Sequence, residues 1–212
     1  MTTVQMLEWF DILQDKFGSP YFTEAEKLLF LTRGSFEYVK NLFPDNEGGL
    51  LNIETDWNTL QNVHTLIFEL SEDNQDTNGR ISRSDVTTDM RTISGDATSE
   101  VFKILSIEFK RGADRFPCKF LRHNDKAEFE RNYFKKPDFD NPRVLFQNTN
   151  LQFRPIDTIV KVYITVLKTP KLLTSSAVNT DLPDTTHNEI VAYALQFAGV
   201  ASRDEILSSM NS

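Results

Sequence analysis

The hydrophobic period of the sequence changes near residue 101, and this change limits the chain to folds that contain both helices and an antiparallel sheet. Before this point apolar residues recur every three or four positions, which is typical of amphipathic helices. After it they alternate with polar residues, as in strands buried on one side, and near residue 187 the helical spacing returns. The order predicts an α+β fold with N-terminal helices, a small antiparallel β-sheet or sandwich, and C-terminal helices.

The first hundred residues predict three helices followed by a long polar loop. Apolar residues at helical spacing mark helices over residues 6–17, 24–43 and 56–70. The second begins with the capping box Thr23–Glu26, in which hydroxyl and carboxylate side chains bond each other's backbone N–H groups. Residues 71–100 are rich in Asp, Asn, Thr and Ser, so a loop is expected there.

Residues 101–171 predict an antiparallel sheet. The expected strands are 101–110, 143–147, 151–154 and 159–167. A short polar turn separates the middle two, which indicates a hairpin, and the last alternates like a half-buried strand. Residues 116–142 contain three prolines and are expected to form a long excursion with a helical turn at 125–131.

Residues 172–212 predict two further helices. An apolar stripe over residues 190–198 ends at Gly199, and a second capping box, Ser202–Glu205, indicates a short terminal helix. The expected segments are a mainly helical lobe over 1–100 with its polar loop at 71–100, a β region over 101–171, and C-terminal helices over 172–212. No repeat or Pro-rich linker separates them, so one compact unit is expected.

The composition limits the class of protein. The chain has 212 residues and a single cysteine, Cys118, which excludes an internal disulfide framework and a multi-cysteine zinc site. No apolar run reaches the about 18 residues needed to span a bilayer, and the first residues lack the pattern of a signal peptide. A net charge of −8 disfavours nonspecific DNA binding. We therefore expect a folded intracellular protein with no membrane partner.

Charge is distributed unevenly along the chain. Residues 1–100 carry 7 Lys/Arg and 18 Asp/Glu, residues 101–171 carry 15 and 8, and residues 172–212 carry 1 and 5. A basic middle between acidic ends can be neutralised within one monomer, or it can pair with the acidic parts of a neighbouring copy. Both arrangements remain open.

The sequence contains none of the common catalytic motifs, such as GxGxxG, GxxxxGK[ST], GxSxG or HExxH. His64, His123 and His187 have no metal-ligand spacing. Cys118 with His123 could form a nucleophile and base, but nothing indicates a third orienting group, so a core or surface thiol is expected. His187 is expected to cap a helix or to lie on the surface. We predict no enzymatic activity and no cofactor.

One segment imitates the calcium-binding loop of an EF-hand. Over residues 74–85, oxygen-bearing side chains fall at loop positions 1, 3, 5, 9 and 12. These weak candidate ligands are Asn74, Asp76, Asn78, Ser82 and Asp85. The first is Asn rather than Asp, the last is Asp rather than the bidentate Glu, and no second loop is present. We assign no metal site and keep calcium binding as an alternative.

The basic middle is interleaved with aromatic residues, a pattern that can indicate stacking of nucleic-acid bases. The residues are Lys110, Arg111, Arg115, Phe116, Lys119, Phe120 and Arg122. Their density is modest and several rings are expected in the core, so no sequence-specific nucleic-acid partner is expected.

Two segments carry a resemblance to a known family. Tyr21–Lys40 contains YFTEAEKLLFL and FEYVK, and Leu182–Val191 reads LPDTTHNEIV. They resemble the N-terminal helix and the start of a C-terminal helix in small virion proteins of tailed bacteriophages, including the crAss-like group. Phe134–Pro137 and Lys168–Pro170 also fit that pattern.

The resemblance implies a virion structural protein of the phage neck, a ring or adaptor subunit of the head–tail connector beneath the portal. It implies a homo-oligomeric ring, portal and tail proteins as partners, assembly in the host cytoplasm, and no catalytic residues. Segments of opposite charge would suit subunits that join head to tail. A calcium-binding EF-hand-like regulatory protein, a soluble interaction module and an enzyme with an unrecognised site remain alternatives.

Overall fold

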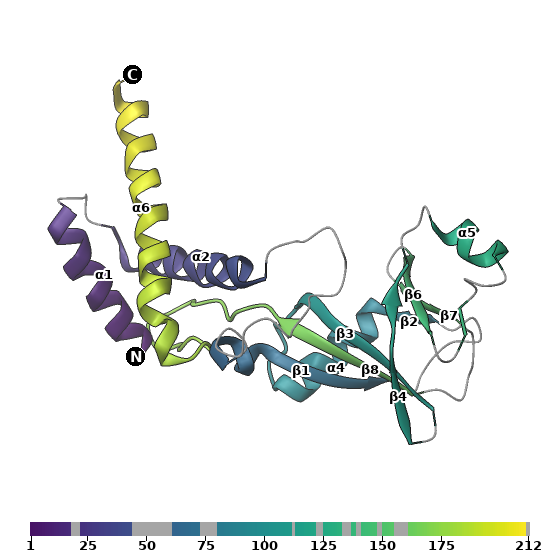
Figure 1. The fold of residues 1–212 in the computed structure, drawn as a ribbon. Coiled ribbons are helices and arrows are strands. Elements are labelled where there is room, and N and C mark those ends of the chain that lie inside the picture. Colours follow the sequence, from purple (N-terminus) through teal and green to yellow (C-terminus); the bar gives the residue numbers. More distant parts are fainter. Residues whose placement is uncertain are drawn as a thin grey trace. The chain divides into compact units, whose positions relative to one another are not determined.

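The structure has the α+β fold that the sequence predicts, with helices at both ends of the chain and two four-stranded β-sheets (Figure 1). The computed structural model describes residues 1–17, 22–43, 61–72, 80–111, 113–121, 125–132, 137–138, 141–147, 150–154 and 161–210.

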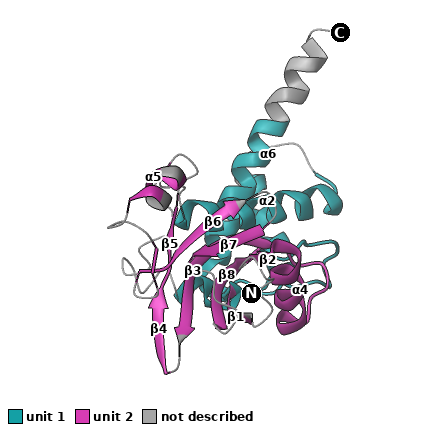
Figure 2. Ribbon diagram, turned by 90° about the vertical axis from the view of Figure 1, so that its right-hand side faces the viewer, with its two compact units in different colours: residues 1–45, 56–66, 170–212 teal, residues 46–55, 67–169 magenta. Residues whose placement is uncertain are grey.

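The chain divides into two compact units (Figure 2). Unit 1 comprises residues 1–45, 56–66 and 170–212, and unit 2 comprises residues 46–55 and 67–169. The sequence suggested a single unit of consecutive segments. In the structure the two ends of the chain come together in unit 1, because the C-terminal helix packs on an N-terminal one.

Unit 1 is built from helices. They are α1 (Thr3–Phe17), α2 (Glu24–Leu42), the 3₁₀-helices η2 (His64–Leu66) and η4 (Asp184–Thr186), and α6 (His187–Met210). Helix α2 begins at the predicted capping box, which is confirmed. The backbone N–H of Glu26 donates to Thr23 Oγ1 at 3.4 Å, and the backbone N–H of Thr23 donates to Glu26 Oε2 at 2.7 Å.

Helices α2 and α6 cross closely at Gly34. A Cβ atom at this position would lie 2.5 Å from the backbone oxygen of Ile190 and 3.1 Å from the backbone nitrogen of Ala194. Ile190, Val191, Ala194 and Ala198 are buried on α6, as their helical spacing predicts. The small residues on both helices therefore allow the two backbones to approach more closely than larger side chains would.

The predicted break at Gly199 is wrong, because α6 is one continuous helix from His187 to Met210. Residues 202–205, which suggested a second helix start, lie inside it. A Cβ atom at Gly199 would meet nothing within 4 Å. One glycine costs a helix only about 1 kcal/mol relative to alanine, which is too little to end it.

Sheet A of unit 2 has the strand order β1–β8–β3–β4, and all neighbours are antiparallel. Its strands are β1 (Ile67–Glu72), β8 (Lys161–Lys168), β3 (Val101–Arg111) and β4 (Asp114–Pro117). Val162, Ile164 and Val166 of β8 are buried, and the residues between them are partly exposed. The predictions of a half-buried strand here and of a strand from residue 101 are confirmed.

Sheet B has the strand order β2–β7–β6–β5. Its strands are β2 (Arg80–Ser82), β7 (Asn150–Arg154), β6 (Arg143–Gln147) and β5 (Lys119–Phe120). The predicted hairpin is confirmed in β6 and β7, which pair antiparallel, whereas β5 pairs parallel with β6. The predicted helical turn is confirmed as α5 (Lys126–Arg131), but β5 was not expected in that excursion.

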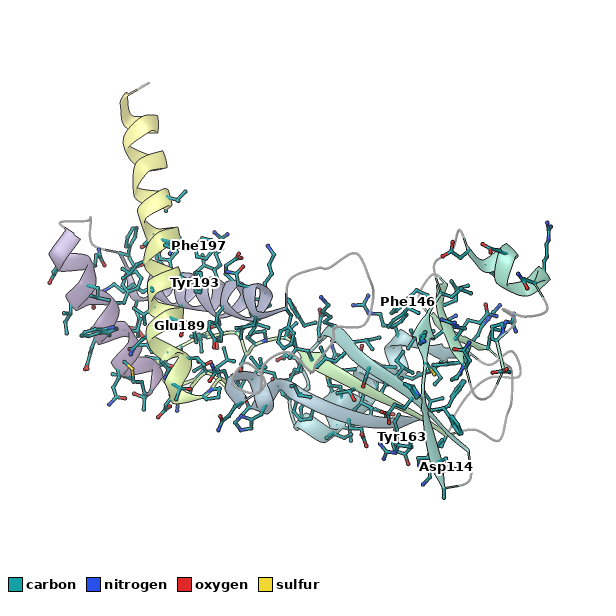
Figure 3. The ribbon with its side chains drawn as sticks, in the orientation of Figure 1. Asp114, Phe146, Tyr163, Glu189, Tyr193 and Phe197 are labelled. Carbon is teal, nitrogen blue, oxygen red and sulfur yellow. The ribbon has the colours of Figure 1, made fainter. Side chains whose placement is uncertain are left out.

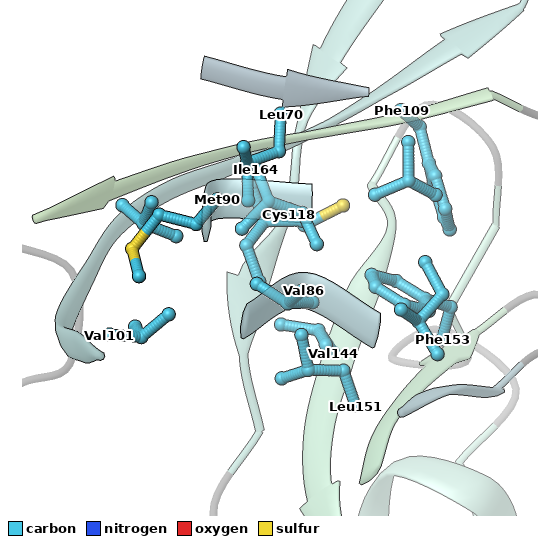
Figure 4. Close-up of a cluster of buried hydrophobic side chains, with 14 residues drawn as sticks. Leu70, Val86, Met90, Val101, Phe109, Cys118, Val144, Leu151, Phe153 and Ile164 are labelled. Carbon is cyan, nitrogen blue, oxygen red and sulfur yellow. The ribbon is translucent and has the colours of Figure 1, made fainter. Parts of the chain in front are cut away.

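One hydrophobic core joins both sheets to helix α4 (Arg83–Ser94) (Figure 4). Its buried side chains come from β1, β2, β3, β6, β7 and β8 and from Val86 and Met90 of α4. The rings of Phe109 on β3 and Phe153 on β7 meet with centroids 5.3 Å apart. The two sheets therefore stabilise each other by burying apolar surface together.

The predicted helix over residues 56–70 is only partly correct. Residues 56–60 lie outside the described residues, and residues 61–66 are helical. Residues 67–70 instead belong to β1, where Phe68 is opposite Val166 and Leu70 is opposite Ile164. Phe68 and Leu70 alternate toward the core, so pairing with β8 determines the structure of a segment that also has helical spacing.

The predicted loop over residues 71–100 is wrong for much of its length, since it contains β2 and α4. On helix α4 the buried residues are Val86 and Met90, one turn apart. Most of the helix therefore faces solvent, which accounts for its polar composition. Its ends match the usual rules, with Ser82 as N-cap and Gly95 in the left-handed conformation (φ 67°) after the last turn. The polar composition obscured a short surface helix.

Candidate interaction surfaces

The structure tests the calcium-like segment only in its second half. Ser82 and Asp85 are described, whereas Asn74, Asp76 and Asn78 lie outside the described residues. Ser82 Oγ accepts a hydrogen bond from the backbone N–H of Ser84 at 3.1 Å, and Asp85 is exposed in the first turn of α4. Strand β1 precedes the segment, so the helix–loop–helix of an EF-hand is not formed. Both described candidates act in starting a helix.

Cys118 is a core thiol, which confirms one of the two expected places for it. It is fully buried between β4 and β5, and its backbone N–H donates to the carbonyl of Ile107 at 2.8 Å. Burial raises the pKa of the thiol to about 12. Since the thiolate is the nucleophilic form, Cys118 is protonated and unreactive at neutral pH. Its suggested base, His123, lies outside the described residues.

His187 is buried at the start of α6 and not on the surface. Its Nε2–H donates to the carbonyl of Leu182 at 3.1 Å, and its Nδ1 lies 3.7 Å from Asp184 Oδ1. The same carboxylate oxygen lies 2.7 Å from the amino group of Met1. Burial lowers the pKa of the imidazole, so the neutral ring is the form that the fold holds. His187 therefore stabilises residues 182–186, which precede α6, by its hydrogen bond to the carbonyl of Leu182.

The residues that could bind metals do not come together in the described parts of the chain. Within those parts, no three His, Cys, Asp or Glu side chains lie close enough to hold an ion. His64, exposed in η2, has its Nδ1 2.7 Å from the carbonyl of Gln61. None of the helices in the same described parts is both long and apolar enough to cross a membrane.

A charged cluster lies on the exposed face of sheet A, with one side chain from each strand. Arg115 of β4 donates to Glu69 of β1 at 3.0 Å and to Glu108 of β3 at 3.4 Å. Its guanidinium lies over the ring of Tyr163 on β8, 3.7 Å from the ring centroid. Tyr163 is labelled in Figure 3. Arg115 thereby joins the basic segment to the acidic N-terminal segment within one molecule.

The charge balance of the two units differs from that of the sequence segments. Unit 2 contains 17 Lys/Arg and 18 Asp/Glu, so the basic middle is almost neutralised within it. Unit 1 contains 6 Lys/Arg and 13 Asp/Glu, a net charge of −7. Compensation within the monomer therefore accounts for most of the basic charge, and the acidic excess is concentrated in unit 1.

The outward side of α1 combines apolar and acidic side chains. We call Val4, Gln5, Glu8, Trp9, Ile12 and Asp15 the α1 outer face; all six are exposed. Val4 is 47%, Trp9 37% and Ile12 48% exposed. The opposite side of the helix packs into unit 1 through Met6 and Phe10, both fully buried. Exposed apolar side chains grouped with charges are typical of surfaces that bind another protein.

A row of three basic residues crosses sheet B on the side away from the core. Lys119 of β5 is opposite Arg143 of β6, which is opposite Arg154 of β7. We call these three residues the cationic row. The adjacent row, at Phe120, Val144 and Phe153, faces the core, so the cationic row lies on the other side of the sheet. Leu145 and Gln152, on that same side, are buried, so the cationic row is at the exposed end of this side. Lys119 is exposed, and Arg143 and Arg154 are partly exposed.

The basic and aromatic stretch does not form one continuous strip for stacking bases. Phe116 and Phe120 pack against the hydrophobic core, as expected for several of these rings. Lys110 and Arg115 belong to sheet A, whereas Lys119 belongs to sheet B. Phe120 also stacks on Phe146, which is 44% exposed near the end of β6 (Figure 3).

The α1 outer face was not predicted from the sequence, although its pattern is visible there. Val4, Trp9 and Ile12 lie outside the stripe that begins at Met6, so α1 has apolar residues on two sides. A helix with a single core-facing stripe would not show this. The cationic row, in contrast, has no local pattern, because pairing of three separate strands creates it.

Comparison with known proteins does not identify a family for this chain. No protein-family model matches the sequence, and no curated protein matches it. Among the residues that the structure describes, two surfaces of opposite charge are candidates for binding a partner, the α1 outer face and the cationic row. Of the described cysteine and histidine side chains, Cys118 and His187 are buried, and His187 is hydrogen-bonded to the backbone of its own chain.

Proposed function

We propose that this protein is a non-catalytic structural subunit of the head–tail connector of a tailed bacteriophage, a ring or adaptor beneath the portal. Its partners in this proposal are further copies of itself and the portal and tail proteins. It resides in the virion after assembly in the host cytoplasm.

The observation that carries the proposal is a contact between the two segments that resemble phage virion proteins. Gly34 lies on α2 between the two resembling stretches of the first segment, 21–31 and 36–40, and Ile190 belongs to the second segment, Leu182–Val191. The close approach of α2 and α6 at these two residues joins the segments in unit 1. Resemblance in two separate stretches is more informative when both contribute to one packed unit, since chance matches need not meet.

The surroundings of the chemically capable residues also support a structural role. Cys118 is buried with a raised pKa, Ser82 caps α4, and His187 holds the chain before α6. Each side chain is used in folding. Exposed apolar side chains on α1 are suited to contacts between proteins.

The proposal is tested by asking whether the protein is a component of particles. Phage particles from a culture that carries this gene are purified on a density gradient, and their proteins are measured by quantitative mass spectrometry. The proposal predicts that the protein copurifies with the major capsid protein at a low and constant copy ratio. Presence only in the soluble lysate, at no fixed ratio to particles, would favour an interaction module that acts outside the virion.

A further inference from the structure

Unit 1 presents an acidic and apolar surface at α1. At 100° per residue, the α1 outer face occupies an arc of about 140° on the helix. All the charged residues among the described side chains of α1 are acidic, namely Glu8, Asp11 and Asp15. Asp11 is paired with Lys27 of α2, so Glu8 and Asp15 are the carboxylates that face outward. Trp9 lies between them in sequence and offers a ring face to a cation.

Unit 2 presents a basic surface at the cationic row. Neighbouring strands are about 4.8 Å apart, so the three basic residues span about 10 Å. Arg143 in the middle makes contacts within its own chain. Lys119 and Arg154, at the two ends of the row, are therefore the side chains that we expect to bind a partner. Lysine and arginine also have aliphatic stems that can lie along apolar side chains such as Val4 and Ile12.

We propose that the cationic row of one copy binds the α1 outer face of another copy of this chain. Glu8 and Asp15 would pair with Lys119 and Arg154, and Trp9 would contact an arginine. The contact joins two different surfaces, so it is heterologous and generates a ring or an open chain of subunits. The inference rests on the proposed function, which it deepens by naming the surfaces through which the copies join.

A second copy fits the cationic row better than a nucleic acid does. The chain has a net charge of −8, and unit 1 alone has −7, so a polyanion is repelled by the molecule as a whole. Each further copy, in contrast, brings an acidic unit of its own. Phe116 and Phe120, the rings nearest to Lys119 in sequence, pack on the core and are not arranged as a stacking platform.

Cross-linking between two variants of the full chain tests the contact. One variant carries Gln5→Cys on the α1 outer face, and the other carries Asn141→Cys, two residues before Arg143 of the cationic row, so that both ends of the row are kept. The native Cys118 is buried, so the introduced thiols react first. The two variants are mixed at high concentration and low salt, oxidised, and analysed for the mixed disulfide by mass spectrometry. The control mixture pairs Gln5→Cys with Lys171→Cys, an exposed lysine of unit 1.

The inference predicts that the first mixture gives several-fold more mixed disulfide than the control, and that the excess falls as salt is added. Arg154→Glu in the Asn141→Cys chain should remove the excess, and a single reversal in the other chain, Glu8→Lys or Asp15→Lys, should restore part of it. Lys171→Glu, which changes net charge equally, should leave it unchanged. Equal cross-linking in both mixtures, or an excess that survives Arg154→Glu, would overturn the inference. So would nucleic acid that binds the wild type and loses affinity on Arg154→Glu.

The two proposals can fail separately. A protein found at the connector whose variants do not cross-link would retain the proposed function and lose this contact. A protein that cross-links as predicted but is absent from particles would retain the contact and lose the connector assignment.

Discussion

Arg115 and Glu69 come from the two edge strands of sheet A, yet their side chains meet across its exposed face at 3.0 Å. Tyr163 and Glu108, on the two strands between them, complete the cluster. The pair connects the basic middle of the sequence to the acidic N-terminal segment inside unit 2. A contact between copies therefore has to use other basic residues than Arg115.

Replacing Arg115 tests whether this pair acts within the monomer. Arg115→Glu places three carboxylates together, so we expect a lower melting temperature and less difference from wild type at high salt. The charge-swapped variant, Arg115→Glu with Glu69→Arg, should recover part of the loss. Differential scanning calorimetry at two salt concentrations measures both effects. An unchanged melting temperature but a lost self-association would show that Arg115 belongs to an interface.

The crossing of α2 and α6 gives a matched pair of glycine substitutions. Gly34→Ala should lower the free energy of unfolding by about 1–3 kcal/mol, because its Cβ would overlap the backbone of Ile190. Gly199→Ala, in open space on the same helix pair, should raise it by up to about 1 kcal/mol through helix propensity. Urea unfolding measures both. Equal effects of the two substitutions would contradict the close crossing.

The buried imidazole of His187 predicts a pH dependence of stability. Its pKa in the folded protein is below the ordinary value of about 6.5, so the unfolded chain binds the proton first as the pH falls. This contribution to stability is fully present above about pH 6.5 and is lost progressively below it. Urea unfolding between pH 5.5 and 8 should show the loss in wild type.

His187→Gln should flatten this pH profile, although the variant is less stable overall. His64→Gln, at an exposed histidine, is the control and should keep the wild-type profile. Identical profiles for wild type and His187→Gln would mean that another group causes the pH dependence.

Substitution of Ser82 and titration with calcium distinguish a helix-capping role of this residue from a metal-binding role. Ser82→Ala removes the bond to the Ser84 N–H and should lower the free energy of unfolding by about 1 kcal/mol. Calcium should bind no more tightly than the millimolar range, because the first and last candidate ligands are weak. Calorimetric titration with calcium chloride measures the affinity. A saturable micromolar isotherm that is abolished by Asp76→Ala would instead establish the calcium site.

The parts of the fold that were predictable have local causes. The capping box at Thr23 and the alternation of Val162, Ile164 and Val166 each act over a few residues, and both are confirmed. Residues 67–70 were misread as helix because their partner in β8 is about a hundred residues away. Gly199 was misread as a helix end, since one glycine costs a helix only about 1 kcal/mol and α6 continues through it.

The two candidate surfaces also differ in whether a local sequence pattern predicts them. The apolar residues on the second side of α1 could have been recognised from helical spacing alone. The cationic row could not, because it depends on which strands pair and in which register. The segment charges allowed either compensation within the monomer or contacts between copies, and folding places most of the opposite charges in one unit.

The position of the protein in an assembled particle tests the connector assignment most directly. Particles are purified, labelled with gold-conjugated antibody against this chain after mild opening of the tail, and imaged by electron microscopy. The proposal predicts label at the junction between head and tail, coinciding with a ring of density beneath the portal. Label along the tail tube or on the capsid faces, or particles without label but with a complete connector, would contradict it.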